Sequence, residues 1–255
     1  MADFPIACQT ITWGDKQKEF FPRVFAEVAA AGFAGVEIGF RHIRETPPAD
    51  LKKMLDQHGL VLAASHVGGN LFDAAQAESE RALLDEVLEY LSAMGTKILM
   101  YSGLRYESDT QLAAGIANLN RAAARCKEQG VSLLYHNHAF EFTDDGKVIR
   151  ALIKDGELGF CPDVGWVMKG GWKINDLLDS ICGRVGVMHF KDFATNGPGC
   201  DTVPLGKGIA PLKEAAEWIK KNTNGLWVIA EQDNADIPPA EAASINAAFL
   251  KEVLA

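Results

Sequence analysis

The stretch IANLNRAAARCKEQGVSLLYHNH, residues 116–138, contains a helix, a turn and a strand in succession, and this unit indicates the fold. Its first half has the apolar spacing of an amphipathic helix. Gly130 follows, and glycine can adopt the left-handed conformation that ends a helix. The run VSLLYH is almost continuously apolar, as expected of a parallel strand that is buried on both faces. The stretch therefore predicts a helix–strand unit whose strand ends at a polar segment, His136 to His138.

The same unit recurs along the chain, most clearly in FPRVFAEVAAAGFAGVEIGF (21–40), LKKMLDQHGLVLAASH (51–66) and LLDEVLEYLSAMGTKILMYSG (83–103). Each of these helices also stops at a glycine. We expect strands at Ile6–Ile11, Gly35–Gly39, Leu60–His66, Lys97–Tyr101, Val131–His136, Leu158–Asp163, Val185–Phe190 and Leu226–Glu231. We expect helices at Glu19–Ala31, Ala49–His58, Glu78–Met94, Thr110–Gln129, Val148–Lys154, Ile174–Cys182, Leu212–Asn222 and Ala240–Leu254.

Eight strand–helix units in a chain of 255 residues predict an α/β fold, a single (β/α)8 TIM barrel. No linker or low-complexity segment interrupts the repeat, so we expect one domain over residues 1–255. The alternative is an open, doubly wound sheet, because sequence periodicity cannot show whether eight parallel strands close into a ring.

Composition and charge restrict the classes of function. Apolar residues make up 48% of the chain, enough for a full core, but no apolar run has the length of a membrane helix. The net charge of −9 argues against a nucleic-acid partner, because phosphates would be repelled. The five cysteines include no C-x-x-C pair, and the start lacks the pattern of a signal peptide. We therefore expect a cytoplasmic protein with no membrane or nucleic-acid partner.

Potential metal ligands stand where the last four expected strands end. Asp163, His189 and Glu231 each follow an apolar run, and the fifth strand offers either His136 or Glu141. Corresponding ends of parallel strands meet on one face of a barrel, where active sites lie. A mixed set of oxygen and nitrogen ligands suits one divalent metal ion, Mn, Co, Mg or Zn.

Other polar and aromatic residues near strand ends are candidates for substrate binding: Trp13, Glu37, His66, Trp166 and Asp192. Each also has a plainer interpretation. Glu37 could form a structural ion pair with Arg41, and the tryptophans could pack the end of the barrel. Gly206-Lys207-Gly208 could bind phosphate through backbone N–H groups, although loop flexibility explains the glycines as well.

These residues carry a resemblance to the sugar phosphate isomerase/epimerase superfamily, the xylose isomerase-like TIM barrels. It spans essentially the whole chain and rests on GFAGVEI, YHNHAFEF, PDVGW, HFKD, PLGKG and AEQD. The resemblance places Asp163, His189 and Glu231 as metal ligands. Many members carry Glu at the end of the fifth strand, where this chain has His136, so either His136 replaces that carboxylate or Glu141 reaches in from the loop.

The resemblance implies a small-molecule sugar or polyol substrate and proton abstraction next to a metal-bound carbonyl, through an enediolate. We expect an isomerase or epimerase, with Glu231, His138, Glu141 and Lys191 as candidate catalytic groups. A metal-dependent dehydratase of the inosose or 3-keto-sugar type is the alternative, and His136 favours it because the two-glutamate scheme of the ketose epimerases is lost. More distant alternatives are an apurinic endonuclease of the same fold and a non-catalytic sugar-binding barrel. Homo-oligomerisation is expected only by analogy.

Overall fold

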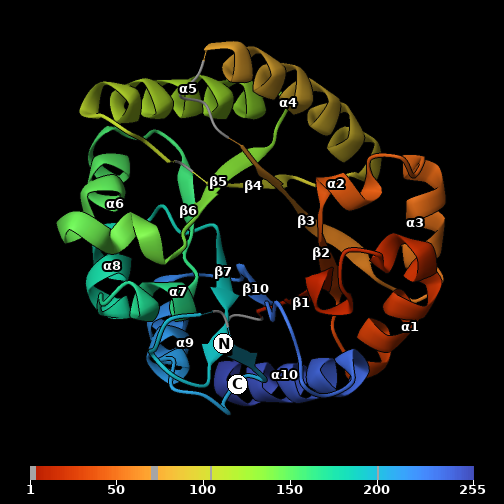
Figure 1. The fold of residues 1–255 in the computed structure, drawn as a ribbon. Coiled ribbons are helices and arrows are strands. Elements are labelled where there is room, and N and C mark those ends of the chain that lie inside the picture. Colours follow the sequence, from red (N-terminus) through yellow and green to blue (C-terminus); the bar gives the residue numbers. More distant parts are fainter. Residues whose placement is uncertain (1–3, 70–73, 104, 200) are drawn as a thin grey trace.

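Parallel strands form the centre of the molecule, and helices surround them (Figure 1). A computed structural model describes residues 4–69, 74–103, 105–199 and 201–255. The eight-stranded sheet runs in the order β6-β5-β4-β3-β2-β1-β10-β7. The strands are β1 (Ile6–Gln9), β2 (Gly35–Gly39), β3 (Val61–Gly68), β4 (Ile98–Ser102), β5 (Ser132–His136), β6 (Gly159–Cys161), β7 (Val187–Phe190) and β10 (Trp227–Ala230).

Contacts between β6 and β7 close the sheet. Two isolated parallel bridges, Phe160 with Val185 and Asp163 with His189, join the two edge strands. The backbone N–H of Gly186 donates to the carbonyl of Phe160 at 3.0 Å, and that of His189 donates to the carbonyl of Pro162 at 2.9 Å. The expected (β/α)8 barrel is therefore confirmed, and the open sheet is excluded.

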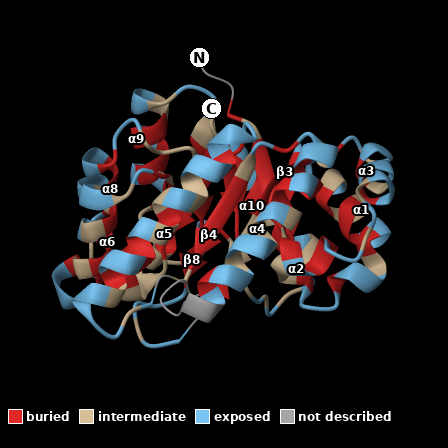
Figure 2. Ribbon diagram, turned by 90° about the horizontal axis from the view of Figure 1, so that it is seen from above, coloured by how far each residue is buried: buried red, intermediate tan, exposed pale blue. Residues whose placement is uncertain are grey.

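Helices follow the strands and cover the outside of the barrel, so their buried faces turn inward and their exposed faces outward (Figure 2). The longer ones are α1 (Phe21–Ala31), α3 (Pro48–Asp56), α4 (Ala74–Met94), α5 (Asp109–Glu128), α6 (Thr143–Asp155), α8 (Ile174–Ser180), α9 (Leu212–Asn222) and α10 (Pro239–Leu254). The short α2 (Phe40–Ile43) and α7 (Val164–Lys169) follow β2 and β6 directly. The last helix, α10, packs against α1, so the final and the first long helices lie side by side.

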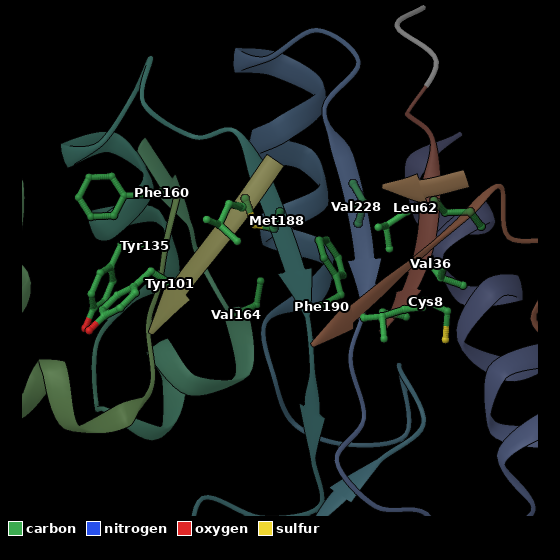
Figure 3. Close-up of a cluster of buried hydrophobic side chains, with 14 of the residues drawn as sticks. Cys8, Val36, Leu62, Tyr101, Tyr135, Phe160, Val164, Met188, Phe190 and Val228 are labelled. Carbon is green, nitrogen blue, oxygen red and sulfur yellow. The ribbon is translucent and has the colours of Figure 1, made fainter. Parts of the chain in front are cut away.

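Alternation along each strand separates two apolar layers. Small and medium side chains fill the barrel interior, among them Ala7, Ala63, Met100, Leu134, Cys161, Val187 and Ile229. The larger neighbours of opposite parity face the helices, including Tyr135, Phe160, Met188, Phe190 and Val228 (Figure 3). On each strand, the residue two positions beyond this inner layer, toward the carboxyl end, therefore also points into the barrel.

Several boundaries differ from expectation for local reasons. β1 ends at Gln9, because Thr10–Trp13 form a 3-10 helix whose first turn is capped by the Gln9 side chain. β6 is short, since Pro162 has no N–H to donate to a ladder. Neither α2 nor α7 was expected from the sequence, nor was the small antiparallel pair β8 (Asp192–Phe193) and β9 (Thr202–Val203).

Candidate metal centre

Four buried side chains converge at the carboxyl end of the barrel interior. His136 follows inward-facing Leu134 by two residues, and the same step leads from Cys161 to Asp163, from Val187 to His189 and from Ile229 to Glu231. Strand pairing aligns these positions, since His136 lies beside Cys161 and His189 beside both Asp163 and Ile229. One ligand atom from each of the four residues lies within 4.8 Å of the others.

The donor atoms fit a divalent cation. His136 Nε2 lies 3.8 Å from Asp163 Oδ2 and 3.6 Å from Glu231 Oε2, distances too long for hydrogen bonds. Among the described residues, His136 Nε2 and Asp163 Oδ2 are buried and have no hydrogen-bond partner. Buried polar atoms of this kind are costly unless something satisfies them. An ion held by two imidazoles and two carboxylates would satisfy both.

Asp163 uses its two oxygens differently. Its Oδ1 accepts a hydrogen bond from the backbone N–H of Trp166 at 2.8 Å and so caps the first turn of α7, while Oδ2 faces the cluster. The Asn137 side chain accepts from the backbone N–H of Asp163 at 3.1 Å. Burial, partly offset by Lys191, raises the pKa of Asp163 to about 7.

Lys191 is a buried cation beside the cluster. It is only 1% exposed, and its Nζ lies 2.9 Å from Asp233 Oδ2, 3.3 Å from Glu231 Oε2 and 3.8 Å from Asp163 Oδ2. Burial opposes its charge, but these three carboxylates outweigh burial and raise its pKa. The same attraction, together with His189, overcomes burial and holds the pKa of Glu231 well below its usual value. Glu231 and Lys191 therefore form a carboxylate–ammonium pair.

His189 stands between two carboxylates. Its Nδ1 lies 2.8 Å from Glu231 Oε2, and its Nε2 lies 2.6 Å from Glu37 Oε2. Burial disfavours a charged imidazole, but Cys161, Glu37 and Glu231 outweigh it and raise the pKa of His189. Glu37 therefore contacts His189, and Arg41 instead pairs with Asp15 at 2.8 Å.

The structure does not bring Glu141 into the cluster. Tyr135, which faces the helix layer, donates its hydroxyl to Glu141 Oε1 at 2.8 Å. The backbone N–H of His138 donates to Glu141 Oε2 at the same distance. Glu141 is fully buried on this outer side, where burial raises its pKa to about 7. Of the two alternatives on the fifth strand, His136 is therefore the one that lies among the other candidate ligands.

Asp192 is also directed away from the cluster, because it has the opposite strand parity to Lys191. Its oxygens accept hydrogen bonds from the backbone N–H groups of Gly206, Gly208 and Ala210, each at 2.9 Å. A side chain at position 208 would clash with Asp192, since a Cβ there would lie 2.3 Å from its Oδ1. Asp192 thus holds the 206–210 loop in place, and its carboxylate accepts hydrogen bonds from N–H groups of the loop that could otherwise bind phosphate.

The remaining candidates divide by position. His66 and His138 adjoin His136, with ring centroids 5.5 and 5.1 Å away, and burial with the nearby charge of Lys191 lowers the pKa of His138 to about 4. Trp166 lies beside Lys191, whose Nζ is 5.1 Å from its ring centroid. Trp13 instead packs in the outer layer and donates Nε1 to Glu27 Oε2 at 2.6 Å. No contact within the described residues joins Trp13 to the cluster.

Three residues at the site carry no expected role from the sequence: Asn137, Ser102 and Asp233. Asn137 holds the backbone of Asp163, Ser102 Oγ lies 2.8 Å from His66 Nε2, and Asp233 pairs with Lys191. Asp233 has a sequence signal, because it follows Glu231 by two residues and so shares its side of the strand end. Asn137 and Ser102 have none, since their partners come from distant segments.

Within the described residues, no helix combines the length and apolar character needed to cross a membrane.

Comparisons with known proteins agree with this architecture. The chain is 26% identical to inosose dehydratase of Geobacillus kaustophilus (strain HTA426), over 91% of this chain and 87% of that protein. A sugar phosphate isomerase/epimerase from Parabacteroides distasonis ATCC 8503 superposes with a TM-score of 0.80 at 20% identity, covering 100% of this chain and 95% of the other. A xylose isomerase-like TIM barrel protein from Mycobacterium smegmatis, in complex with magnesium, gives a TM-score of 0.77 at 13% identity, over 98% and 96% of the two chains.

The sequence resemblance is confirmed by a family model as well. The model described as "Xylose isomerase-like TIM barrel" matches residues 25–253, which is most of the chain. The barrel and the cluster of potential metal ligands at its carboxyl end are consistent with this match. The chain therefore belongs to the xylose isomerase-like TIM barrel family.

Proposed function

We propose that this chain is a divalent-metal-dependent enzyme that removes a proton beside the ketone of a sugar or polyol and then expels water, as a dehydratase. The observation that carries the proposal is the buried pair of Lys191 Nζ and Glu231 Oε2, 3.3 Å apart, next to the candidate metal ligands. The pair supplies a base and an acid on the same side of a bound substrate. The similarity to inosose dehydratase supports the same reaction class.

The proposed metal ligands are His136, Asp163, His189 and Glu231. A divalent ion bound by them would polarise the ketone and stabilise the negative charge that develops when the neighbouring proton leaves. We propose that residues 1–255 act as one domain, because the ligands come from strands on both sides of the closing seam between β6 and β7.

Glu231 is the proposed base. The low pKa of its carboxylate, caused by Lys191 and His189 despite burial, keeps it ionised at neutral pH and ready to accept the proton from the carbon beside the ketone. The electrons of the broken C–H bond then form a C=C bond conjugated with the carbonyl group.

Lys191 is the proposed acid. As the new double bond forms, the C–O bond to a hydroxyl on the next carbon breaks, and Lys191 gives that oxygen a proton so that it leaves as water. Glu231 can then return its proton to Lys191 across the 3.3 Å between them. The balance is substrate to dehydrated ketone plus one water, with both side chains restored.

Isomerisation or epimerisation is the second candidate, because it shares the first step and because a sugar phosphate isomerase/epimerase has a similar fold. Epimerisation needs a second base on the opposite face of the substrate. Glu141, a candidate for that base, accepts hydrogen bonds from Tyr135 and from the backbone N–H of His138 on the outer side of the strand, and so does not face the cluster. These features favour dehydration.

The test is proton NMR and mass spectrometry in D2O, with metal-loaded protein and a panel of inososes, 3-keto sugars and ketoses. We expect at least one substrate to yield a product lighter by one water. Lys191→Met should lower the rate of water loss by about 10²–10⁴-fold while deuterium exchange beside the ketone continues. Lys213→Met, which changes an exposed lysine on α9, is the matched control and should behave as the wild type.

If the wild type exchanges the proton beside the ketone for deuterium but expels no water, the dehydratase proposal is wrong and the protein is an isomerase or epimerase. If no substrate of the panel shows either exchange or water loss, the proposed chemistry is wrong.

A further inference from the structure

Glu37 is a fully buried carboxylate on β2, and it lies outside the group of four candidate ligands. A buried acid of this kind needs a partner, because loss of water around a carboxylate is costly. The sequence suggested substrate contact or an ion pair with Arg41. The structure shows a different partner, His189, which is separated from Glu37 by 152 positions in the sequence.

The contact fixes which nitrogen of His189 faces the cluster. Glu37 Oε2 lies 2.6 Å from His189 Nε2, on the far side of the ring from Nδ1, and Nδ1 lies beside Glu231. A carboxylate can only accept when ionised, so the proton of this hydrogen bond belongs to Nε2. Nδ1 lies beside Glu231 Oε2 and is the nitrogen through which His189 would bind an ion, which would take the place of any proton on Nδ1.

The backbone around Glu37 is shaped for this contact. The pairing of β2 with β3 shifts register between Val36 and Glu37, so that Glu37 pairs with Ala64 instead of Ala63. Such a bulge re-aims side chains next to it and is common beside active sites. The other oxygen of Glu37, Oε1, lies 3.7 Å from His66 Nδ1. The second ring nitrogen of His66, Nε2, is hydrogen-bonded to Ser102 Oγ at 2.8 Å.

We propose that Glu37 is a positioning residue for the metal centre: it orients His189, fixes its proton on Nε2 and thereby presents Nδ1 as the ligand atom. A carboxylate behind a ligating histidine also raises the basicity of the ring and tightens metal binding. The inference rests on the metal centre of the proposed function, but it does not depend on which reaction that centre performs.

A double-mutant cycle tests the proposal through metal affinity, which needs no substrate. The dissociation constant for Zn²⁺ or Co²⁺ is measured by competition with a chromophoric chelator in the wild type, Glu37→Gln, His189→Gln and the double variant. We expect Glu37→Gln to weaken binding about 10–100-fold in the wild-type background. In the His189→Gln background the same change should cost less than about 3-fold, because the group through which Glu37 acts is missing.

Glu141→Gln is the matched control, since it also replaces a fully buried glutamate, but one in the segment after β5 that does not touch His189. It should leave the metal affinity unchanged. A second measurement is the ¹⁵N chemical shifts of the His189 ring in the Zn²⁺-loaded protein, which should show a protonated Nε2 in the wild type.

The outcomes separate two kinds of failure. If the wild type binds no divalent ion, the proposed metal centre is wrong and the role of Glu37 is overturned with it. If the wild type binds the ion but Glu37→Gln has no effect, or has the same effect with and without His189, only the positioning role is overturned. In the last case Glu37 would act directly on the ion or on the fold.

Discussion

At the scale of single residues, His136 distinguishes the candidate metal centre from one built mainly of carboxylates. It brings a neutral imidazole nitrogen to within 3.6 Å of Glu231 and 3.8 Å of Asp163. Imidazole suits Zn²⁺ and Co²⁺, whereas Mg²⁺ prefers oxygen ligands. An ion held by this donor set of two imidazoles and two carboxylates would therefore be expected to be a transition-metal ion.

His136→Glu should move this preference toward Mg²⁺. We expect the ratio of the Mg²⁺ to the Zn²⁺ dissociation constant to fall by about 10-fold or more, because a third carboxylate replaces a nitrogen ligand. Isothermal titration with both ions measures the ratio. His138→Gln, which changes a neighbouring imidazole outside the ligand group, is the control and should preserve it. An unchanged ratio in His136→Glu would show that residue 136 does not bind the ion.

Glu141 should make stability depend on pH. Burial raises its pKa from 4.5 to about 7 in the folded protein, so the folded state favours the protonated acid. The stability that Glu141 contributes is therefore fully present at pH values below the pKa of the unfolded chain. It is lost as the pH rises through about 7, where the folded protein must ionise the buried carboxyl group. Its upper limit is about 3 kcal/mol, from about 1.4 kcal/mol per unit of pKa.

Urea unfolding of the wild type and Glu141→Gln at pH 5 to 8.5 measures this effect. The glutamine variant should gain stability relative to the wild type as the pH rises, because glutamine does not ionise. Glu214→Gln, on the exposed face of α9, is the control and should follow the wild type. A constant difference between wild type and Glu141→Gln would contradict the assignment.

At the scale of elements, the close approach of α7 to the segment after β7 holds Asp163 and Lys191 together. A Cβ at Gly165 would lie 2.6 Å from the carbonyl oxygen of Lys191 and 2.8 Å from the Phe193 ring. Only a residue without a side chain allows this contact. The α7 helix can therefore lie close enough to place Asp163, which caps its first turn, and Trp166 beside the cluster.

Gly165→Ala should push α7 outward. We expect a loss of about 1–3 kcal/mol in the free energy of unfolding, as for other overpacked sites, together with weaker metal binding because Asp163 moves. Denaturant unfolding and metal titration test both effects. Gly197→Ala, whose nearest contact would be an ordinary 3.4 Å to Thr195, is the control. Wild-type metal affinity in Gly165→Ala would show that α7 does not position Asp163.

At the scale of the whole molecule, the candidate ligands span the weakest seam of the barrel. β6 and β7 meet through isolated bridges, and Asp163 and His189 are themselves bridge partners. An ion that binds only the folded state stabilises it by mass action, by about 2.7 kcal/mol at 100 times the dissociation constant. Bound metal should therefore strengthen the closure of the barrel.

We expect chelation of the metal to lower the melting temperature by about 5–10 °C under these conditions, given about 2–4 °C per kcal/mol for a chain of this size. Hydrogen exchange at the amides of Gly186 and His189, which donate across the seam, should become faster when the metal is removed. Asp163→Asn retains a helix cap but loses a ligand, so its melting temperature should not respond to metal. An equal response of wild type and variant would contradict the seam assignment.

The sequence by itself predicted the eight strand–helix units and the strand ends at which the candidate ligands lie, whereas the closure of the barrel and the choice of His136 over Glu141 came from the tertiary structure. Both predictions depend on short-range periodicity: the recurring helix–glycine–strand unit sets the number of strands, and the period of two places His136, Asp163, His189 and Glu231 one step beyond the inner apolar layer. Only the tertiary structure decided how the neighbouring polar groups are used. Glu37 hydrogen-bonds to His189, Asp192 accepts from the backbone of the 206–210 loop, and Glu141 accepts from Tyr135. Each buried carboxylate needs hydrogen-bond donors, and the folded chain decides which donors lie beside it. Those donors come from backbone register, a bulge and distant segments, none of which has a local signature in the sequence.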